Sequence, residues 1–457
     1  MFRQSTSCVL LAASLAAQHP YQLVDLGVLP GASGSVGRGI SPDGRRIVGW
    51  SGNTAFVWEE GVGMLPLPML PGYSFAAARD VDSHGNVVGT MGLEVTGPAP
   101  ARAVRWNPGG TITNLGTIGG GRFSMAFGIN DLGQIAGYSE VLSTTTLWHA
   151  FLWGTSGMVD LTPATADTFG YDVNQFGEVA GYDSWNAFRH SPMTGTLWLG
   201  QPPGFTFSTG MAINDAGQVA GSVTNASGSS QRMARWTDGI GWEVFGGAGN
   251  DNQLSGINSF GQVVGTGLPP AGGYGGVLYT DGLGMQHLNT LVDPAVNSWL
   301  KYAHSINDRG QISGHRYDNT FAQFRAFRLD PQFMTVYGQG CAGGNGHVPK
   351  LAIAGLPKAQ NRIVIMLAEG APGGVAVLVL SGSPAAAPIG FGCTVSVALP
   401  APVSVLVPLD QLGQGRMVLD LPAGSTSGTV YLQYASIDLA APNGLLALSN
   451  GVALQIL

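Results

Sequence analysis

The sequence predicts an all-β chain in which a seven-bladed β-propeller is followed by a C-terminal β-sandwich. Three observations support this fold class. One glycine-containing phrase recurs seven times between residues 40 and 314, each repeat has patterns for four short strands, and all ten Trp residues precede residue 331. Repeats of about 44 residues with four strands each are typical of propeller blades.

The first 17 residues have the three parts of a secretory signal peptide. Arg3 gives a short basic start, residues 8–17 form an apolar run, and Ser14 and Ala16 place small residues ahead of a cleavage site. Cleavage after Ala16 or after Ala17 fits, and the alternative is a short buried helix. An apolar run of this length cannot span a bilayer, which takes about 20 residues. We therefore expect a secreted protein, extracellular or at the cell surface, without a membrane span.

The recurring phrase predicts a β-hairpin at the start of each repeat. It consists of an aliphatic residue, a small polar residue, two variable positions, Gly, a polar residue, two small apolar residues and a final Gly. Its copies are Ile40–Gly49, Val81–Gly89, Ile129–Gly137, Val173–Gly181, Ile213–Gly221, Ile257–Gly265 and Ile306–Gly314. Asn or Asp three residues before Gly favours a tight turn, because the side chain can bond its own backbone and Gly accepts a positive φ. Metal binding by the Asp at the third position is the weaker interpretation, since Pro, Ser or Gln replaces it in several copies. We expect no metal.

Two further patterns complete each repeat. A segment of alternating large apolar residues, such as Ala150–Trp153, predicts a third strand. A Gly-containing turn and a fourth segment follow, as in Met158–Leu161 and Met285–Leu288.

The two ends of the repeat region are complementary. Residues Tyr21–Gly27 match a fourth strand that lacks its first three, and the last repeat stops at Ala326–Leu329 without a fourth strand. If the N-terminal segment completes the last blade, the ring closes over residues 18–330 and leaves no exposed sheet edge. An open arc is the alternative.

Several phrases resemble a known family. The segments AFLW (Ala150–Trp153), INDLGQIAG (Ile129–Gly137) and NLGTIGGG (Asn114–Gly121) resemble the HAF-type repeats of bacterial extracellular proteins. The hairpin Ser41–Val48 is similar to the strand-turn-strand of TolB-like propeller blades, which implies that the hairpin lies innermost in each blade. Tyr279 and His190 depart from the pattern, which usually has Trp there. The family has no settled chemistry, so the resemblance implies no catalytic residues.

The composition changes near Pro331, and residues 331–457 predict a separate β-sandwich. Apolar runs such as Arg362–Leu367, Val375–Leu380 and Thr429–Tyr434 alternate with turn signals. Without the signal peptide two cysteines remain, Cys341 and Cys393, and an even count in an exported chain predicts a disulfide. Two free thiols or half of a metal site are the alternatives.

The frame around Cys341 also resembles a recurrent C-terminal module of bacterial secreted proteins. The resemblance covers Tyr337–Cys341, the Gly-Cys pair at 392–393 and the ending Leu448–Ala453. It implies a role in sorting, anchoring or accessory binding.

Composition excludes some function classes. The net charge is −7 without a basic cluster, so nucleic acid is not an expected partner. The sequence has no spacing typical of a catalytic or phosphate-binding motif, so we expect neither catalysis nor a cofactor. The eight His residues are scattered and are interpreted as packed or surface residues.

Two sets of residues are candidates for ligand binding. The loops that enter the innermost strands and those that leave the second strands share one face of a propeller. This rim contains Tyr73, Phe75, Arg122, Phe123, Trp299 and Tyr302, together with Asp167, Phe205, Phe207, Trp148, Trp185 and Tyr317. Exposed aromatic side chains on one rim are typical of a binding surface, although half of them could pack under their own loops.

The second set lies in the innermost strands, two positions before the recurring Ile or Val. It consists of Arg38, Arg79, Phe127, Tyr171, Met211, Ser255 and His304. Such variation among sister blades could build an asymmetric site, or it could be drift where packing is permissive.

The leading hypothesis is a monomeric, noncatalytic binding or interaction protein that uses one propeller face. Its partner would be an extracellular glycan, a peptide or an envelope component. One alternative is a polysaccharide hydrolase or lyase at the propeller channel, with Asp80 and Asp172 as paired acids. This alternative requires that the two carboxyl groups face each other and are not packed between blades. A purely structural envelope protein is the other alternative.

Overall fold

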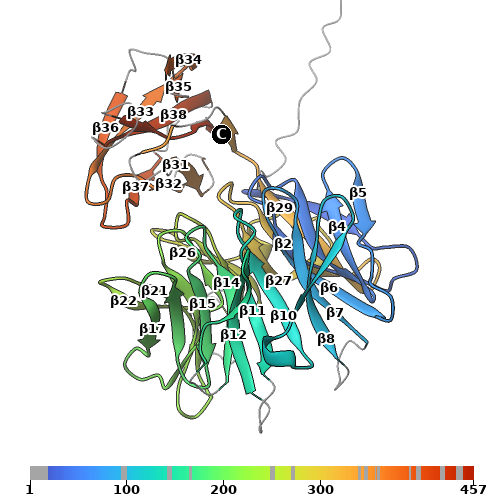
Figure 1. Ribbon diagram of the computed structural model, residues 1–457. Coiled ribbons are helices and arrows are strands. Elements are labelled where there is room, and N and C mark those ends of the chain that lie inside the picture. The colour runs from blue at the N-terminus through green and yellow to red at the C-terminus, as the bar shows by residue number, and fades with distance from the viewer. Residues whose placement is uncertain are drawn as a thin grey trace, which may run out of the picture.

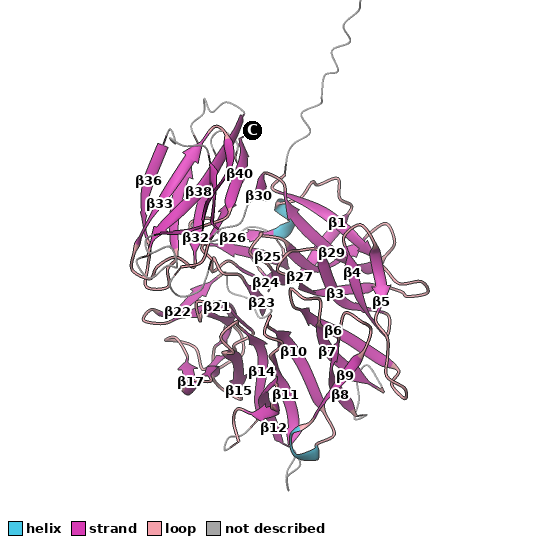
Figure 2. Ribbon diagram, turned by 45° about the horizontal axis from the view of Figure 1, so that its top comes forward, coloured by secondary structure: helices cyan, strands magenta, loops and turns pink. Residues whose placement is uncertain are grey.

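The computed structural model is all-β in the part of the chain that it describes, as predicted. The described residues are 19–93, 100–141, 147–163, 167–246, 253–268, 273–337, 341–343, 348–355, 357, 361–390, 393–397, 403–421, 428–438 and 446–456. The helical structure within these ranges is two short 3-10 turns, η1 (Ile118–Gly120) and η2 (Leu288–Thr290) (Figure 2). None of the described helices is long and apolar enough to cross a membrane. The predicted signal peptide, residues 1–17, lies outside the described residues.

Each repeat forms one antiparallel sheet whose strands pair in sequence order (Figure 1). The first sheet consists of β2 (Ser35–Ile40), β3 (Arg46–Ser51), β4 (Thr54–Glu59) and β5 (Gly63–Pro66). The second consists of β6 (Phe75–Val81), β7 (Val87–Gly92), β8 (Ala101–Trp106) and β9 (Ile112–Gly116). The third consists of β10 (Ser124–Ile129), β11 (Ile135–Val141), β12 (Leu147–Gly154) and β13 (Gly157–Asp160). The fourth sheet consists of β14 (Thr168–Val173), β15 (Val179–Asp183), β16 (Ala187–Ser191) and β17 (Gly195–Gly200).

The fifth sheet has a divided first strand. Both β18 (Phe207–Ser208) and β19 (Ala212–Ile213) pair with β20 (Val219–Thr224), which is followed by β21 (Gln231–Thr237) and β22 (Gly241–Phe245). The sixth sheet consists of β23 (Gln253–Ile257), β24 (Val263–Gly267), β25 (Gly275–Thr280) and β26 (Gly284–His287).

The seventh sheet joins the two ends of the repeat region. It consists of β27 (Ser298–Ile306), β28 (Ile312–Asp318), β29 (Gln323–Pro331) and the N-terminal β1 (Tyr21–Gly27). Strand β1 runs antiparallel to β29, with Leu23 opposite Leu329 and Gly27 opposite Ala326. The predicted pairing of the N-terminal segment with the last repeat is confirmed.

Apolar contacts continue around the repeats. Each sheet packs against the next, and the seventh packs against the first. At this last junction Ala326 of β29 is buried with Ile47 and Phe56 of the first sheet. The repeat region therefore closes on itself.

The recurring phrase forms the predicted turn. Asn130 Oδ1 accepts hydrogen bonds from the backbone N–H groups of Leu132 and Gln134, and Gly133 has a φ of 73°. The other side of the amide connects neighbouring sheets, because Asn130 Nδ2 donates to the carbonyl of Asn174 at 2.8 Å. The equivalent side chains continue this Asn ladder from turn to turn, through Asn174, Asn214, Asn258 and Asn307 to the carbonyl of Ser41.

The Asp residues at the third position of the phrase also bond between turns. Asp131, Asp215 and Asp308 accept hydrogen bonds from the backbone N–H groups of Ser83, Gln175 and Ser259. Among the described residues, no group of three or more His, Cys, Asp or Glu side chains could hold a metal ion.

The C-terminal region contains two larger sheets and a small hairpin. The six-stranded sheet consists of β30 (Met334–Tyr337), β40 (Gly451–Ile456), β38 (Gly428–Ile437), β33 (Val375–Ser381) and β36 (Val403–Pro408), with β39 (Leu446–Leu448) beside β38. The three-stranded sheet consists of β31 (Lys350–Ala354), β32 (Arg362–Ala368) and β37 (Gly415–Asp420), and the hairpin of β34 (Pro384–Gly390) and β35 (Cys393–Val397). Residues of both larger sheets, among them Ile365 and Leu432, share one apolar core. Cys341 is buried, and the side chain of Cys393 lies outside the described residues, so the disulfide stays a prediction.

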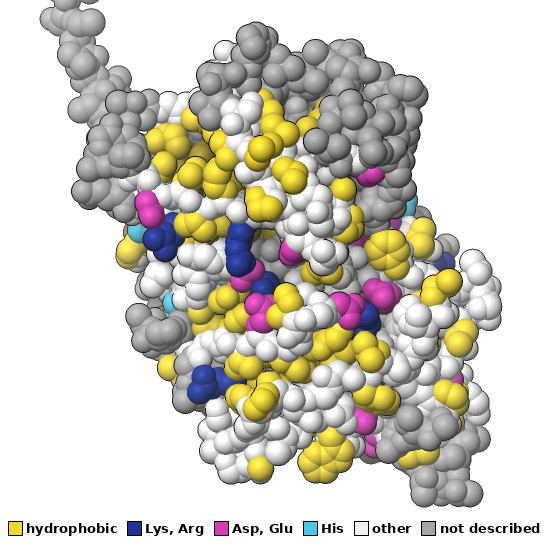
Figure 3. Space-filling view, turned by 90° about the vertical axis from the view of Figure 1, so that its left-hand side faces the viewer, with side chains coloured by type: hydrophobic (Ala, Val, Ile, Leu, Met, Phe, Trp, Pro, Cys, Tyr) yellow, Lys and Arg dark blue, Asp and Glu magenta, His cyan; other side chains and the backbone are white. Residues whose placement is uncertain are grey.

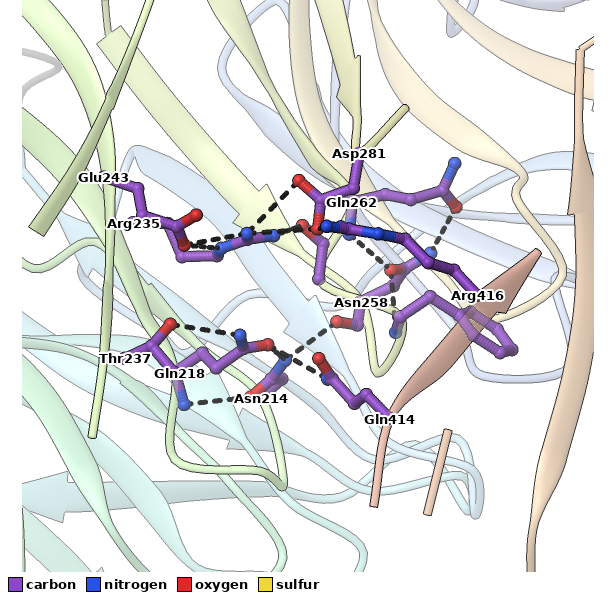
Figure 4. Close-up of polar contacts among 12 residues, drawn as sticks. Asn214, Gln218, Arg235, Thr237, Glu243, Asn258, Gln262, Asp281, Gln414 and Arg416 are labelled. Atoms are coloured by element: carbon purple, nitrogen blue, oxygen red, sulfur yellow. Dashed lines mark hydrogen bonds and ion pairs between the residues drawn. The ribbon is translucent and has the colours of Figure 1, made fainter. Parts of the chain in front are cut away.

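The C-terminal strands lie at the end of the ring that carries the Asn-Gly turns (Figure 1). Gln414 Nε2 donates to Gln218 Oε1 at 3.1 Å and to the carbonyl of Ser259 at 2.9 Å, and Arg416 pairs with Asp281 at 2.7 Å (Figure 4). Lys350 joins Asp308 of a turn to Glu369. Basic and acidic side chains gather along this junction in the space-filling view (Figure 3).

Candidate functional site

The first strands of the seven sheets surround a cavity of about 300 Å³. All seven residues of the varied column line it: Arg38, Arg79, Phe127, Tyr171, Met211, Ser255 and His304. The seven equivalent positions therefore present six kinds of side chain to one space, since only Arg occurs twice.

Two arginines form a cationic side of this cavity. The guanidinium carbons of Arg38 and Arg79 each lie 5.2 Å from the ring centre of Trp50, and Arg79 is also 5.2 Å from the ring of Phe127. Among the described residues, neither guanidinium is paired with a carboxylate, and the Nε atom of each is buried without a hydrogen-bond partner. By contrast, Arg235 pairs with both Glu243 and Asp281.

This lack of neutralisation has an electrostatic consequence. Burial, together with repulsion from Arg79, lowers the pKa of Arg38 to about 9. Burial also lowers the pKa of Arg79. A buried charge without a partner is unfavourable, so the site would gain stability from an anion.

Two histidines extend the cationic side without adding charge. Arg38 Nη1 lies 3.2 Å from His304 Nδ1, and His304 Nε2 lies 3.1 Å from His315 Nδ1. Burial, followed by the nearby positive charges, lowers the pKa of His304 well below its ordinary value and that of His315 to about 3. Both rings are therefore neutral, and donors run from Arg38 through His304 to His315.

The cavity wall that adjoins Arg79 is aromatic. Phe127 and Tyr171 lie 4.8 Å apart between ring centres, Tyr138 contacts Phe127 at 5.3 Å, and Tyr182 stacks on Tyr171 at 5.4 Å. The hydroxyl groups of Tyr171 and Tyr182 are 3.2 Å apart. Burial raises the pKa of Tyr138 to about 12, so its ring carries a neutral hydroxyl.

Sequence reasoning missed a second column, which lies behind the first. Trp50, Tyr138, Tyr182 and His315 all follow the final Gly of the recurring phrase, in the second strands. In the other three repeats this position is Thr90, Ser222 or Thr266. The variation among sister repeats at this position is the sequence signal of this second column.

Asp80 and Asp172 also line the cavity, but their carboxylates are packed between sheets. Asp80 Oδ2 accepts from the N–H of Ile129 at 3.0 Å, and Asp172 Oδ2 accepts from the N–H of Ile213 at 2.9 Å. Gly39 of the preceding sheet leaves the necessary room, because a Cβ there would lie 2.6 Å from the Asp80 Cα. The condition for a pair of catalytic acids facing each other across the channel is therefore not met.

Burial dominates the protonation of both acids. It raises the pKa of Asp80 to about 7 and that of Asp172 to about 8, and mutual repulsion adds to the shift of Asp172. Near neutral pH a large share of these carboxyls is protonated, and they offset the arginine charges only in part.

Several of the predicted rim residues join the aromatic cluster around Tyr138 and Tyr182. Trp148 lies 5.7 Å from Phe123 and 5.6 Å from Tyr138, and Phe207 lies 6.0 Å from Tyr182, between ring centres. Tyr302 stacks on His315 at 4.5 Å and so lies beside the cavity residues. Trp299 is 40% exposed and Trp185 65% exposed, while Arg122 is exposed and lies over Phe123.

Other rim side chains are part of the packing. Tyr73 packs on the core between the first two sheets, and Asp167 accepts a hydrogen bond from the N–H of Trp148. Half-buried side chains make up much of the remaining set: Phe75, Phe123, Phe205, Phe207 and Trp148. Tyr317 is exposed beside Phe324.

Comparisons with known proteins find only distant similarity. No protein-family model matches the chain, and no curated protein matches it. The chain is similar to the crystal structure of TolB from Acinetobacter baumannii, with 12% identity, a TM-score of 0.33 and coverage of 66% of each chain. It is also similar to a tetra-tandem repeat in the extending region of a large adhesion protein, with 12% identity, a TM-score of 0.16 and coverage of 94% of this chain and 93% of that chain. Neither similarity assigns a family or a function.

Proposed function

We propose that the chain is a secreted binding protein whose HAF-type repeats form a closed seven-bladed β-propeller, followed by a β-sandwich. The four-stranded sheets, the pairing of β1 with β29 and the contact of the last sheet with the first support the propeller. The apolar core shared by two C-terminal sheets supports the sandwich.

Secretion would remove residues 1–17 and allow Cys341 to pair with Cys393. We expect N-terminal sequencing of the exported protein to begin at residue 17 or 18, and its intact mass to be lower by two hydrogens than that of the reduced chain. A mature protein that retains residues 1–16, or that has two alkylatable thiols without reduction, would contradict this proposal.

The binding role is supported by one observation: seven side chains of six kinds line one cavity, and its two arginines form no ion pair with a described carboxylate. A purely structural envelope protein has no need for such a polar, asymmetric space. Ligand sites typically combine apolar walls with a few placed polar groups. The proposed partner is an extracellular glycan, a peptide or an envelope component, bound without catalysis by a monomer.

A cavity-filling substitution tests this role. We expect Ser255→Trp, which would fill the cavity, to abolish retention of the ligands that wild-type protein binds on glycan and peptide arrays. Ser227→Trp on an exposed turn is the matched control and should retain them. Equal binding by both variants, or turnover of a polysaccharide by the wild-type protein, would overturn the proposal.

A further inference from the structure

We propose that this cavity binds an oxyanion carried on a sugar-sized ring, with Arg38 and Arg79 holding the anionic group. The ligand class is therefore an acidic saccharide unit, whose charge is a carboxylate, a sulfate or a phosphate. This inference rests on the proposed binding function and adds the chemistry of the ligand.

The first argument is charge. Arg38 and Arg79 contribute two positive charges to the cavity wall, and no described carboxylate pairs with them. The acids that share the cavity, Asp80 and Asp172, accept hydrogen bonds from backbone N–H groups of the next sheet. Burial raises the pKa of both acids, so they offset the charge of the two guanidinium groups only in part.

The second argument is the arrangement of donors. The ring centre of Trp50 lies 5.2 Å from the guanidinium carbon of both arginines, so one indole contacts the two groups. Arg38 uses Nη1 to donate to His304, and its buried Nε has no partner, nor has that of Arg79. A planar guanidinium with free N–H groups matches the spacing of oxygens in a carboxylate, sulfate or phosphate.

The third argument is shape. Phe127 and Tyr171 form the wall next to Arg79 in a cavity of about 300 Å³, at the lower limit of small-ligand sites. This space suits one ring rather than a long chain, and an aromatic wall packs against the flat face of a sugar ring. Phe127 also contacts Arg79, so the anionic group and the ring would be held side by side.

Galacturonate and galactose are matched probes, because they share a ring and differ in one carboxylate. We expect calorimetry to show binding of galacturonate to the full mature chain and at least tenfold weaker binding of galactose. Arg38→Gln combined with Arg79→Gln should weaken galacturonate binding at least tenfold. Arg45→Gln, which removes an exposed charge near the turn end of the first sheet, should change it less than twofold.

Inorganic sulfate and phosphate show how much of the binding comes from the anionic group alone, without a sugar ring. Binding of either ion that is weaker than that of galacturonate or a sulfated monosaccharide supports a ring-bearing ligand. Equal affinity for the bare ions overturns the saccharide part. Equal affinity for galactose and galacturonate overturns the anion inference, while the proposed binding function survives.

A stability measurement keeps the inference testable without a known ligand. In chloride buffer we expect the double variant to unfold at a higher temperature than wild type, because it lacks two unneutralised charges. Sulfate at equal ionic strength should raise the unfolding temperature of wild type more than that of the double variant. If the double variant misfolds, the single variants serve in its place. Identical sulfate responses of wild type and variants overturn the inference.

Discussion

Asp80 and Asp172 occupy a first-strand position that is Gly, Ala or Ser in the other five repeats. Each carboxyl bridges to the backbone of the next sheet, at Ile129 and Ile213, and has a raised pKa because it is buried. Between the ordinary value of 3.8 and the raised values near 7 and 8, the folded protein binds protons that the unfolded chain has released. Their contribution to stability is therefore complete below the ordinary value and is lost as the pH rises through 7 and 8.

An Asp172→Asn variant tests this pH dependence. The amide cannot ionise, yet its oxygen can still accept the N–H of Ile213. At pH 8.5 we expect the variant to be more stable than wild type by roughly 1–3 kcal/mol, with a smaller difference at pH 5. Urea denaturation across this pH range measures the effect. Asp293→Asn, at an exposed acid, is the control. Parallel profiles of unfolding free energy against pH for wild type and Asp172→Asn would show that Asp172 does not cause the pH dependence.

The Asn ladder also stabilises the fold through individual residues. Asn258 closes its own turn through Oδ1 and reaches the carbonyl of Asn307 through Nδ2 at 3.3 Å. Asn258→Ala should cost about 2–4 kcal/mol in unfolding free energy, because buried donors and acceptors lose their partners on both sides. Asn225→Ala removes only bonds within its own turn, to Ser229 and Ser230, and should cost about 1 kcal/mol. Equal costs in chemical denaturation would show that the bond between turns contributes nothing.

Among the strands, β1 is the one that closes the repeat region. Without it, β29 would expose a row of unpaired backbone groups. Leu23 lies opposite Leu329 and packs on the core of the last sheets, whereas neighbouring Gln22 is exposed. Leu23→Asp should lower stability by about 2 kcal/mol or more and promote aggregation measured by light scattering, while Gln22→Asp should behave as wild type. A soluble and fully stable Leu23→Asp protein would argue against closure by this strand.

At the scale of the whole molecule, the C-terminal region covers the turn end of the ring. Lys350 holds this contact through Asp308 and Glu369. Burial opposes the ionisation of Asp308, but attraction to Lys350 outweighs it and lowers the pKa of Asp308. The aromatic and cationic side chains of the cavity belong to the first and second strands of the sheets. These parts of the strands lie toward the end of the ring that is opposite the turns, and the C-terminal region does not cover that end.

Lys350→Gln tests this docking. It would leave two acids without their shared partner, and we expect a looser junction, with faster proteolysis between the two regions and a larger radius in solution X-ray scattering. Arg362→Gln breaks an exposed pair with Asp420 that solvent screens, and it should leave the proteolysis rate and the radius as in wild type. A compact Lys350→Gln protein with wild-type proteolysis would contradict the proposed contact.

The sequence by itself determined the local units of this protein: seven similar hairpins, five of them with Asn in the turn, four strands a repeat, two complementary ends and a varied column in the first strands. These follow from short-range patterns, since turn chemistry and strand alternation act over a few residues. Only the tertiary structure decided that Arg38 and Arg79 lack acidic partners, that Trp50 and Tyr138 stand behind the first column, that Asp80 and Asp172 bridge sheets, and that Lys350 docks on a turn. Each of these depends on a neighbour in another strand or sheet, and nothing within one repeat specifies which residue that neighbour will be.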